Sequence, residues 1–586
     1  MAIGNKKVTP KLRDIREGAS IIDMLNQPAE LYPSKACFRY RRKGADCAVN
    51  YSEMKQFVDS FAAGLIGLGL GKEHVAVIGE KSPEWVIAFL GIIEAGGVAV
   101  PLDKDLSFDE IPGFVQFADC KAAVYTQKYA EAFENSDERL SEVEKFFKID
   151  LTVPAEKLLS GGTEELEDKF NSFTSFIRYG NSLLQKGLEL PDPNTHLDDL
   201  ALIIFTSGTT GTSKGVMLSQ RNMAFVCNQS VKHVELTDSD VLLSLLPLHH
   251  TYEMTAGLLS PMLCGATICI NDNLSSLLAD FRHYRPTLMA VVPLIVTNMA
   301  KRIDSKIASQ GREKTVAMAK MLGDGLYKLG FDVRRKLFAE ILEAFGGRLR
   351  GLVCGGAALD PKLVGKFASF GISVQQGYGI TECAPVIAII PYDVPNPASC
   401  GRLLEGMQIY IDKENCDDKT GEICVKGPNV MLGYYKNKEA TDDVLTNRGW
   451  FCTGDCGYVD DNKFIYITGR KKNVIVLGNG KNIFPEEIEE YLAGVPFISD
   501  CMVTAREGAD KKLVLTVIIY PDYDEAKKRN ALETEEDLKN FYKSEIAKLN
   551  RKLPAFKQIR NIEIRKSPFP KTSTQKIKRH KVKEGE

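Results

Sequence analysis

The stretch Thr206-Ser-Gly-Thr-Thr-Gly-Thr-Ser-Lys-Gly-Val216 directly follows an apolar run, Leu-Ala-Leu-Ile-Ile-Phe, at residues 200–205. Three glycines, six hydroxyl residues and one lysine fill positions 206–215. Glycine lets the backbone bend close to a ligand, and successive N–H groups in such a bend form an anion-binding concavity. Hydroxyl and ammonium groups add donors for phosphate oxygens. The stretch predicts a polyphosphate-binding loop after a strand, although the spacing is not that of a Walker loop and composition alone also allows a flexible surface loop.

Length and composition restrict the class of protein. A chain of 586 residues is too long for one ordinary core, so we expect at least two domains. The apolar fraction of 44% and the charged fraction of 26% are typical of a soluble globular protein, and the net charge of −2 gives no field that favours nucleic acid. The beginning of the chain lacks the apolar core of a signal peptide. The fourteen cysteines are scattered without zinc-site spacing, which favours reduced thiols and a cytoplasmic location.

The order of apolar runs predicts the architecture. Residues 75–78 and 98–102 have the composition of buried strands, and residues 83–96 between them have helix signals, which predicts a parallel sheet. Residues 131–190 are polar and predicted to be mostly helical. Further strand-like runs occur at 242–246, 267–270, 288–292 and 349–353. We therefore expect an α/β protein with a large N-terminal domain of packed sheets flanked by helices, residues 1–469, and a small α+β C-terminal domain, residues 470–586.

Three further segments have the composition of a ligand site. In the segment 354–359, a Gly-Gly-Ala turn follows a strand and brings the backbone close to a flat ligand. In the segment 376–383, glycines flank Tyr378 so that its ring can stand open for a base, and Glu382 is a hard ligand suited to Mg²⁺. Asp455 follows a tight turn, where a carboxylate can accept ribose hydroxyls. Each segment by itself also fits an ordinary structural turn.

Taken in chain order, these segments resemble the AMP-forming adenylate ligases, the superfamily of acyl-CoA synthetases, luciferases and peptide-synthetase adenylation domains. The resemblance runs from about residue 30 to Lys578 and includes the basic tail that begins Pro570-Lys-Thr. It implies that the small C-terminal domain is mobile and that the site lies between the two domains. It also implies two half-reactions with ATP, Mg²⁺ and coenzyme A: formation of an acyl-adenylate with release of pyrophosphate, then transfer of the acyl group to the thiol with release of AMP.

The resemblance also implies roles for the matching residues. Thr381 lies near the α-phosphate, Glu382 ligates magnesium, Lys472 is the hinge, and Lys576 is the catalytic lysine that bridges the carboxylate and the phosphate. The implied phosphate-binding residues are Thr206, Ser207, Gly208, Thr209, Thr210, Gly211 and Lys214. The implied adenine- and ribose-binding residues are Gly356, Ala357, Ala358, Tyr378, Asp455 and Arg470. Two positions depart from the family pattern: Ser213 replaces a proline, and Gln575 replaces a glycine.

The acid substrate is indicated by two segments. Residues 246–253 lack the aspartate with which adenylation domains pair an amino group, which disfavours an α-amino acid. His250 matches the histidine beside the acyl site of acyl-CoA synthetases, although a packed structural histidine is the alternative. Residues 299–345 resemble the helical insertion of fatty acyl-CoA synthetases, so a medium- to long-chain fatty acid is favoured over an aryl acid. Residues 300–322 could also contact a membrane surface weakly, but we favour a solvated surface helix.

Two alternative functions remain open on the sequence. An enzyme of the same fold could pass its acyl group to the phosphopantetheine of an acyl carrier protein or stop at the adenylate. A catalytically silent nucleotide-binding scaffold is disfavoured because Glu382, Asp455 and Lys576 are all present. The sequence does not indicate the oligomeric state.

Overall fold

The computed structural model describes residues 12–135, 137–162, 165–206, 213–271, 274–413, 420–476, 482–492, 494–507, 513–530, 532, 534–571 and 577–583. The described residues form two compact units. The first comprises those within Met1–Thr206, Ser213–Met407 and Lys426–Thr446, and the second comprises those within Gln408–Val425 and Asn447–Glu586. This grouping does not decide where a mobile domain would begin, so the boundary at residue 470 stays a prediction.

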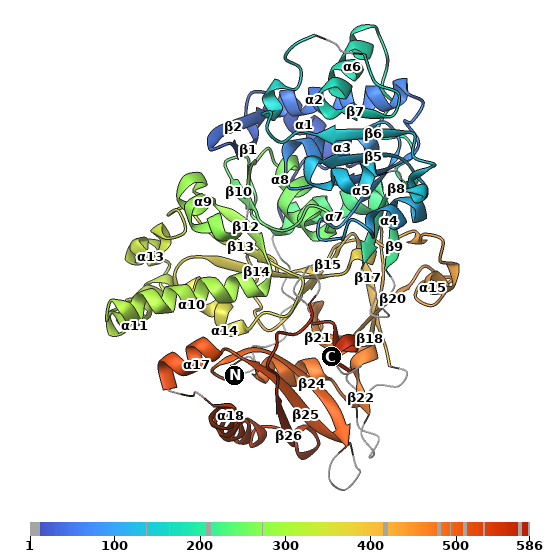
Figure 1. Ribbon diagram of the computed structural model, residues 1–586. Helices are drawn as coiled ribbons and strands as arrows, with labels where there is room; N and C mark the ends of the chain where they lie inside the picture. The colour runs from blue at the N-terminus through green and yellow to red at the C-terminus, as the bar shows by residue number, and fades with distance from the viewer. Residues whose placement is uncertain are drawn as a thin grey trace. The chain divides into compact units, whose positions relative to one another are not determined.

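The first unit contains a sheet with the strand order β19-β9-β8-β4-β3-β5-β6-β7 (Figure 1). The predicted parallel strands are present, because β3 (His74–Ile78) pairs in parallel with both β4 (Val98–Pro101) and β5 (Cys120–Thr126). The intervening helix α3 (Pro83–Glu94) is buried along its whole length and begins with Pro83 after the N-cap Ser82. The remaining strands are β6 (Lys145–Ile149), β7 (Phe170–Ser172), β8 (Leu200–Thr206), β9 (Lys214–Ser219) and β19 (Gly433–Tyr434).

Strands β6 and β7 correct one expectation from the sequence. Residues 131–190 were expected to be mostly helical, but residues 145–149 pair in parallel with β5 and residues 170–172 pair with β6. The reason is tertiary, since Phe146 and Phe147 are buried against the sheet. The long helix of this segment is α6 (Phe173–Gln185), and the short α5 (Ala130–Glu134) lies at its start.

A second sheet of the first unit has the order β16-β15-β14-β13-β12-β10-β11-β1-β2. Its parallel strands β10 to β13 confirm the apolar runs that the sequence indicates between residues 242 and 353. The bounds are β1 (Ala36–Arg42), β2 (Ala45–Asn50), β10 (Val241–Ser244), β11 (Thr267–Ile270), β12 (Leu288–Val291), β13 (Gly351–Cys354), β14 (Ser373–Gly379), β15 (Val386–Ile389) and β16 (Gly401–Leu403).

Helices cover the sheets of the first unit. The segment 299–345, expected to be one long helical region, is divided among α10 (Pro293–Ser309), α11 (Glu313–Lys328), α12 (Arg334–Leu337) and α13 (Ala339–Glu343). With α14 (Pro361–Ser369), the helices α10 and α11 gather on one side of β12–β14 (Figure 1). The other helices are α1 (Asp23–Leu31), α2 (Tyr51–Gly67), α4 (Ile111–Phe117), α5 (Ala130–Glu134), α7 (Gln220–His233), α8 (Ser260–Leu263), α9 (Leu277–Tyr284) and α15 (Lys438–Asp442).

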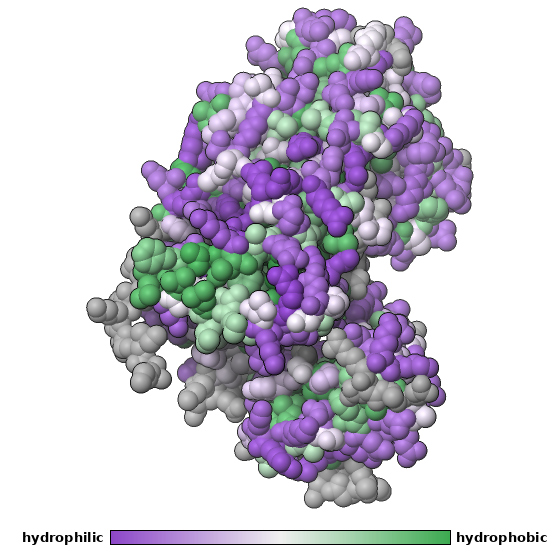
Figure 2. Space-filling model, turned by 90° about the vertical axis from the view of Figure 1, so that its left-hand side faces the viewer, coloured by the Kyte–Doolittle hydropathy of each residue, from purple (hydrophilic) through white to green (hydrophobic). Residues whose placement is uncertain are grey.

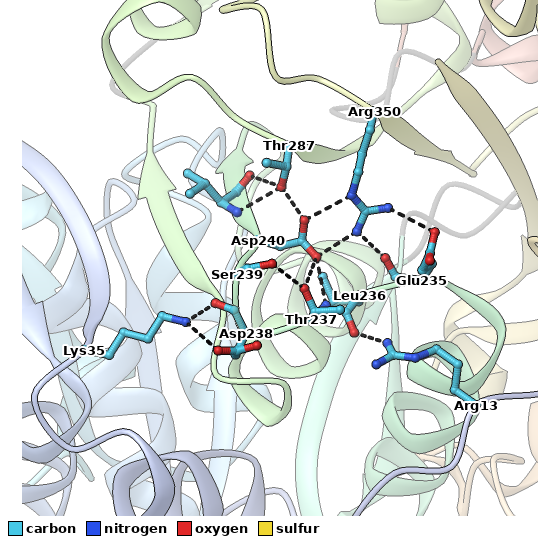
Figure 3. A network of polar contacts seen from close by, with 11 residues as sticks. Arg13, Lys35, Glu235, Leu236, Thr237, Asp238, Ser239, Asp240, Thr287 and Arg350 are labelled. Atoms are coloured by element: carbon cyan, nitrogen blue, oxygen red, sulfur yellow. Dashed lines mark hydrogen bonds and ion pairs between the residues drawn. The ribbon is translucent and has the colours of Figure 1, made fainter. Parts of the chain in front are cut away.

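The amino end of β10 is fixed by a buried carboxylate, Asp240 (Figure 3). Thr287 donates to one carboxylate oxygen at 2.6 Å, and Arg350 contacts the other at 2.8 Å. Burial alone would raise the pKa of Asp240, but these hydrogen bonds outweigh it and hold the pKa below its ordinary value. The network ties the starts of three neighbouring strands, β10, β12 and β13, to one another.

The second unit has four strands in the order β17-β18-β20-β21, a hairpin of β22 and β23, and a sheet in the order β24-β25-β26. The expected helix after Thr534 is α18 (Glu535–Asn550), and the Thr534 hydroxyl accepts from the backbone N–H of Asp537 as an N-cap. The other bounds are β17 (Gln408–Asp412), β18 (Gly421–Lys426), β20 (Phe451–Val459), β21 (Phe464–Arg470), β22 (Ile475–Val476), β23 (Asn482–Ile483), β24 (Ile498–Glu507), β25 (Leu513–Pro521), β26 (Asn561–Ile564), α16 (Pro485–Leu492), α17 (Tyr523–Asn530) and α19 (Arg579–Lys583). In the described part of the chain, no helix has the length and apolar character needed to cross a membrane.

Candidate active site

The predicted phosphate loop joins two antiparallel strands. Thr206 is the last residue of β8 and lies opposite Lys214, the first residue of β9. Ser207, Gly208, Thr209, Thr210 and Gly211 lie outside the described residues. The Lys214 ammonium lies 4.6 Å from the centre of the Tyr434 ring, because β19 pairs with β9 and places Tyr434 opposite Val216. The described ends of the loop are therefore held side by side, with the lysine at the start of β9.

Tyr434 connects this lysine to the carboxylate that the sequence indicates for magnesium. Its hydroxyl donates to Oε1 of Glu382 at 2.8 Å. Burial and the neighbouring carboxylate raise the pKa of the Tyr434 phenol, so Tyr434 stays a donor. Thr381 and Glu382 begin a short 3₁₀ turn, Thr381–Cys383, which directly follows β14. The fold thus brings Tyr434 into contact with both Lys214 and Glu382, although the three residues are far apart in the sequence.

The chemistry of Glu382 fits a magnesium ion that is held mainly by its substrate. Among the residues that the structure describes, no group of three or more His, Cys, Asp or Glu side chains is arranged to hold a metal. In nucleotide sites, Mg²⁺ is commonly bound by one or two carboxylates together with phosphate oxygens. Glu382 offers such a carboxylate, with one oxygen oriented by Tyr434 and with the Thr381 hydroxyl on the adjacent residue.

The predicted adenine-binding segments lie at the same edge of the second sheet. Strands β13 and β14 are parallel neighbours, and Cys354 lies opposite Gln376. The Gly356–Ala358 turn and Tyr378 each begin two residues after this pair, so they lie at the same end of the two strands. Gly356 has φ +87°, a conformation that a side chain would strain, and Ala357 and Ala358 are exposed. Tyr378 is 7% exposed, which corrects the expectation of an open ring: its strand pairs with β15, opposite Ala388, and is covered.

The predicted ribose-binding residues belong to the second unit and contact each other. Asp455 on β20 lies opposite Arg470, the last residue of β21. The Arg470 Nε lies 2.6 Å from Oδ1 of Asp455, and the Asp455 residue is only 3% exposed. The pairing of two antiparallel strands therefore brings the two predicted residues together and orients the carboxylate.

The structure describes the predicted hinge residue Lys472 but not the predicted catalytic lysine. Lys472 lies on a short 3₁₀ turn, Lys471–Asn473, directly after β21, and is exposed. Lys576 lies outside the described residues. Its described neighbours Lys571 and Ile577 form an isolated antiparallel bridge, and Lys571 pairs with Asp500 at 2.8 Å.

His250 lies in the segment that leaves the carboxyl end of β10. It is half-buried, and its ring centre lies 4.2 Å from that of His249. His249 is buried, and its Nε2 lies 3.2 Å from Oδ1 of Asp103, which follows β4. Because β4 and β10 belong to different sheets, the two histidines lie where the carboxyl ends of both sheets approach each other.

Glu253 is a buried group that sequence reasoning did not assign. It begins a π-helix, Glu253–Leu259, and has no exposed surface. The Ser244 hydroxyl donates to Oε1, whereas Oε2 has no hydrogen-bond partner among the residues that the structure describes. Burial raises the pKa of Glu253 to about 7 despite the nearby Lys81 ammonium. A Cβ on Gly257 would lie 2.4 Å from Cδ of Glu253, so Gly257 provides the space for the carboxylate. The only sequence signals are this glutamate in an apolar stretch and the glycine four residues later.

Tyr434 was also missed, because nothing local indicates its role. The segment Gly433-Tyr434-Tyr435 looks like an ordinary strand start, and only the pairing of β19 with β9 brings Tyr434 to Glu382. A strand–loop–strand rich in glycine and threonine, next to a lysine and an oriented carboxylate, is the arrangement of an enzyme that handles nucleotide phosphates.

Comparison with known proteins agrees with this class. Residues 25–435 match the family described as AMP-binding enzyme, and residues 472–585 match the AMP-binding enzyme C-terminal domain. The chain therefore belongs to the AMP-binding enzyme family.

Relatives and solved structures of this family cover most of the chain. A long-chain-fatty-acid–CoA ligase of Rattus norvegicus is 28% identical over 500 residues, which is 80% of this chain and 72% of the relative. A chloroplastic long-chain-fatty-acid–[acyl-carrier-protein] ligase of Arabidopsis thaliana is 26% identical over 603 residues, 91% of this chain and 80% of the relative. The crystal structure of an anthranilate CoA ligase in complex with anthranoyl-AMP superposes with a TM-score of 0.75 at 20% identity and covers 98% of both chains, which confirms the fold.

Proposed function

We propose that this protein is an AMP-forming acyl-CoA synthetase that activates a medium- to long-chain fatty acid. The observation that carries the proposal is the contact of Tyr434 with both Lys214 and Glu382, where Lys214 ends the glycine- and threonine-rich stretch of sequence, in a chain of the AMP-binding enzyme family. In the first half-reaction the acid attacks the α-phosphorus of ATP and pyrophosphate leaves. In the second, the thiol of coenzyme A attacks the acyl-adenylate and AMP leaves.

Each residue has a separate task in this proposal. Lys214 and the loop neutralise the β- and γ-phosphates, and Glu382 holds the magnesium that offsets their charge, with Thr381 near the α-phosphate. Gly356, Ala357, Ala358 and Tyr378 bind adenine, and Asp455 and Arg470 bind the ribose. Lys576 bridges the acid and the α-phosphate, Lys472 is the hinge of a mobile C-terminal domain, and His250 lies beside the acyl group.

The proposal also includes the acyl acceptor and the cellular location of the protein. Coenzyme A is preferred to a carrier protein because the relative of highest similarity reported above is named for CoA, whereas the plant relative is named for acyl carrier protein. The thirteen cysteines in the described part of the chain form no disulfide with one another, which supports a reducing compartment, and we propose the cytoplasm. Comparing AMP formation with coenzyme A and with holo acyl carrier protein distinguishes the two acceptors.

The decisive experiment combines a substrate panel with one variant. Pyrophosphate release is measured with fatty acids of increasing chain length, aryl acids and α-amino acids. Burial of about 0.8 kcal/mol per methylene predicts that kcat/KM rises about fourfold for each added methylene until the acyl site is full. Background rates with every acid would overturn the proposal and favour a silent scaffold.

The variant Lys576→Ala tests the role of the tail lysine. We expect pyrophosphate release to fall by about 10²–10³-fold, as when a transition-state donor is removed, while thioester formation from preformed adenylate is retained. Lys578→Ala is the matched control, since Lys578 lies two residues away and has no assigned role. Unchanged pyrophosphate release in Lys576→Ala would show that the lysine is wrongly assigned.

A further inference from the structure

The helix α11 exposes apolar residues on the side that faces away from the protein. Met318, Met321 and Leu322 are 64%, 75% and 55% exposed, and their spacing of three and four residues places them on one side of the helix. The opposite side packs inward, since Gly323 is buried and Val316 and Ala319 contact the core. This is the reverse of an ordinary surface helix, whose outer side is polar.

Two further exposed apolar residues follow the helix in the chain. Leu329 and Phe331 follow α11 directly and are 73% and 65% exposed. We call Met318, Met321, Leu322, Leu329 and Phe331 the α11 face. Figure 2 shows hydrophobic residues gathered on the side of the molecule that carries α11 in Figure 1. Single exposed apolar residues are common, but five within one helix and the short segment after it are a concentration of the kind that marks an interaction site.

The segment that contains the α11 face is rich in basic residues. Residues 301–336 contain ten Lys or Arg against four Asp or Glu, a local charge of +6 in a chain whose net charge is −2. Lys314 and Lys328 stand exposed near the two ends of α11. Lys320 is different, because its ammonium points inward, 4.4 Å from the centre of the Phe370 ring.

From this combination we infer that the α11 face docks on an anionic lipid bilayer. An apolar helix side flanked by lysines matches the boundary between acyl chains and anionic headgroups, where the apolar residues enter the lipid and the lysines remain at the headgroups. A second copy of the chain is a poorer occupant, since a two-fold interface brings the same positive patch against itself. The functional advantage of docking rests on the proposed function. A long-chain fatty acid partitions into the bilayer, and docking places the enzyme next to the membrane that contains this substrate.

Vesicle flotation without any substrate tests the docking itself. The probes are vesicles of phosphatidylcholine alone and of phosphatidylcholine with phosphatidylserine. We expect the protein to float with the anionic vesicles and to be released by salt. The variant Met318→Ser/Met321→Ser/Leu322→Ser should bind at least tenfold more weakly, and Lys314→Glu/Lys328→Glu should lose the preference for phosphatidylserine.

Matched controls separate docking from folding and from the proposed activity. Leu31→Ser/Leu513→Ser removes apolar residues of comparable exposure elsewhere (54% and 47%) and should bind vesicles like the unmodified protein. All variants should keep the activity on a short, water-soluble acid measured without vesicles. Vesicle binding that survives in the serine variant overturns the inference, as does a dimer of the unmodified protein that the serine variant dissociates. Because flotation uses no acid, failure of the proposed function would leave its result unchanged.

Discussion

Two buried carboxylates lie at opposite ends of the same strand, β10, and their surroundings differ. Asp240, at the amino end, is contacted by Arg350 and Thr287, and its pKa is lowered. Glu253, beyond the carboxyl end, has one oxygen without a hydrogen-bond partner in the described part of the chain, and its pKa is raised to about 7. In open α/β sheets, ligands bind outside the carboxyl ends of the strands. Asp240, whose two oxygens are both contacted, therefore contributes to stability. Glu253 lies at the end of the sheet where ligands bind in such folds.

The largest expected effect is on Asp240. Asp240→Ala leaves Arg350 and the Thr287 hydroxyl without their common acceptor, so we expect a loss of about 3 kcal/mol in the free energy of unfolding, the lower end for breaking a buried ion pair, since Arg350 is partly exposed. Urea denaturation measures this loss. The folded variant should retain its kcat for acid activation. Asp238→Ala, which removes a half-exposed carboxylate from a pair with Lys35 at 3.8 Å, is the control and should cost little. A loss of activity without a loss of stability would reverse the assignment.

The second effect depends on pH and concerns Glu253. A carboxyl group whose pKa is raised from 4.5 to about 7 by folding stabilises the protein below pH 4.5, and this contribution is lost as the pH rises through 7. Relative to Glu253→Gln, the unmodified protein should lose about 2.5 kcal/mol of stability between pH 5 and pH 8. Chemical denaturation of both proteins at each pH gives this difference. The control is Glu235→Gln, which changes an exposed glutamate that precedes β10. A difference that does not change with pH would mean that Glu253 is not neutral at pH 5.

The smallest effect extends the comparison to a third carboxylate, Glu382. Tyr434→Phe removes the donor at 2.8 Å from Oε1, and we expect pyrophosphate release to fall about two- to tenfold, the value of one hydrogen bond of about 0.5–1.5 kcal/mol. Tyr435→Phe is the neighbouring control, because its hydroxyl contacts Asp119 instead. If Tyr434→Phe lowered the free energy of unfolding but left the rate of pyrophosphate release unchanged, Glu382 would have a structural role like that of Asp240 and not a role in the active site.

Much of the fold was predictable because its signals are local. The strand runs at 75–78 and 98–102, the intervening helix with its Pro83 start and the Thr534 cap all depend on residues near one another in the sequence. The strands β6 and β7 were not predictable in this way. A five-residue run with lysines at two positions becomes a strand only because β5 offers a partner and two phenylalanines are buried.

The same distinction holds for the candidate site. The sequence motifs mark Asp455 and Arg470, and the structure places them in contact through a strand register that no motif encodes. Tyr434 and Glu253 could not be found from the sequence, because their roles depend on partners that the fold brings from distant segments. The roles proposed for Lys472 and Lys576 remain predictions.

Gly257 has a practical consequence for engineering thermostability. Replacing a glycine inside a helix with alanine commonly stabilises a protein by about 0.4–1 kcal/mol, because it restricts the unfolded chain. Here the added methyl group would lie 2.4 Å from the Glu253 carboxyl carbon. The carboxylate would have to leave its present position, or the helix would have to shift. A consensus-style glycine-to-alanine change at this position would therefore lower the melting temperature and displace a carboxyl group whose pKa folding raises to about 7.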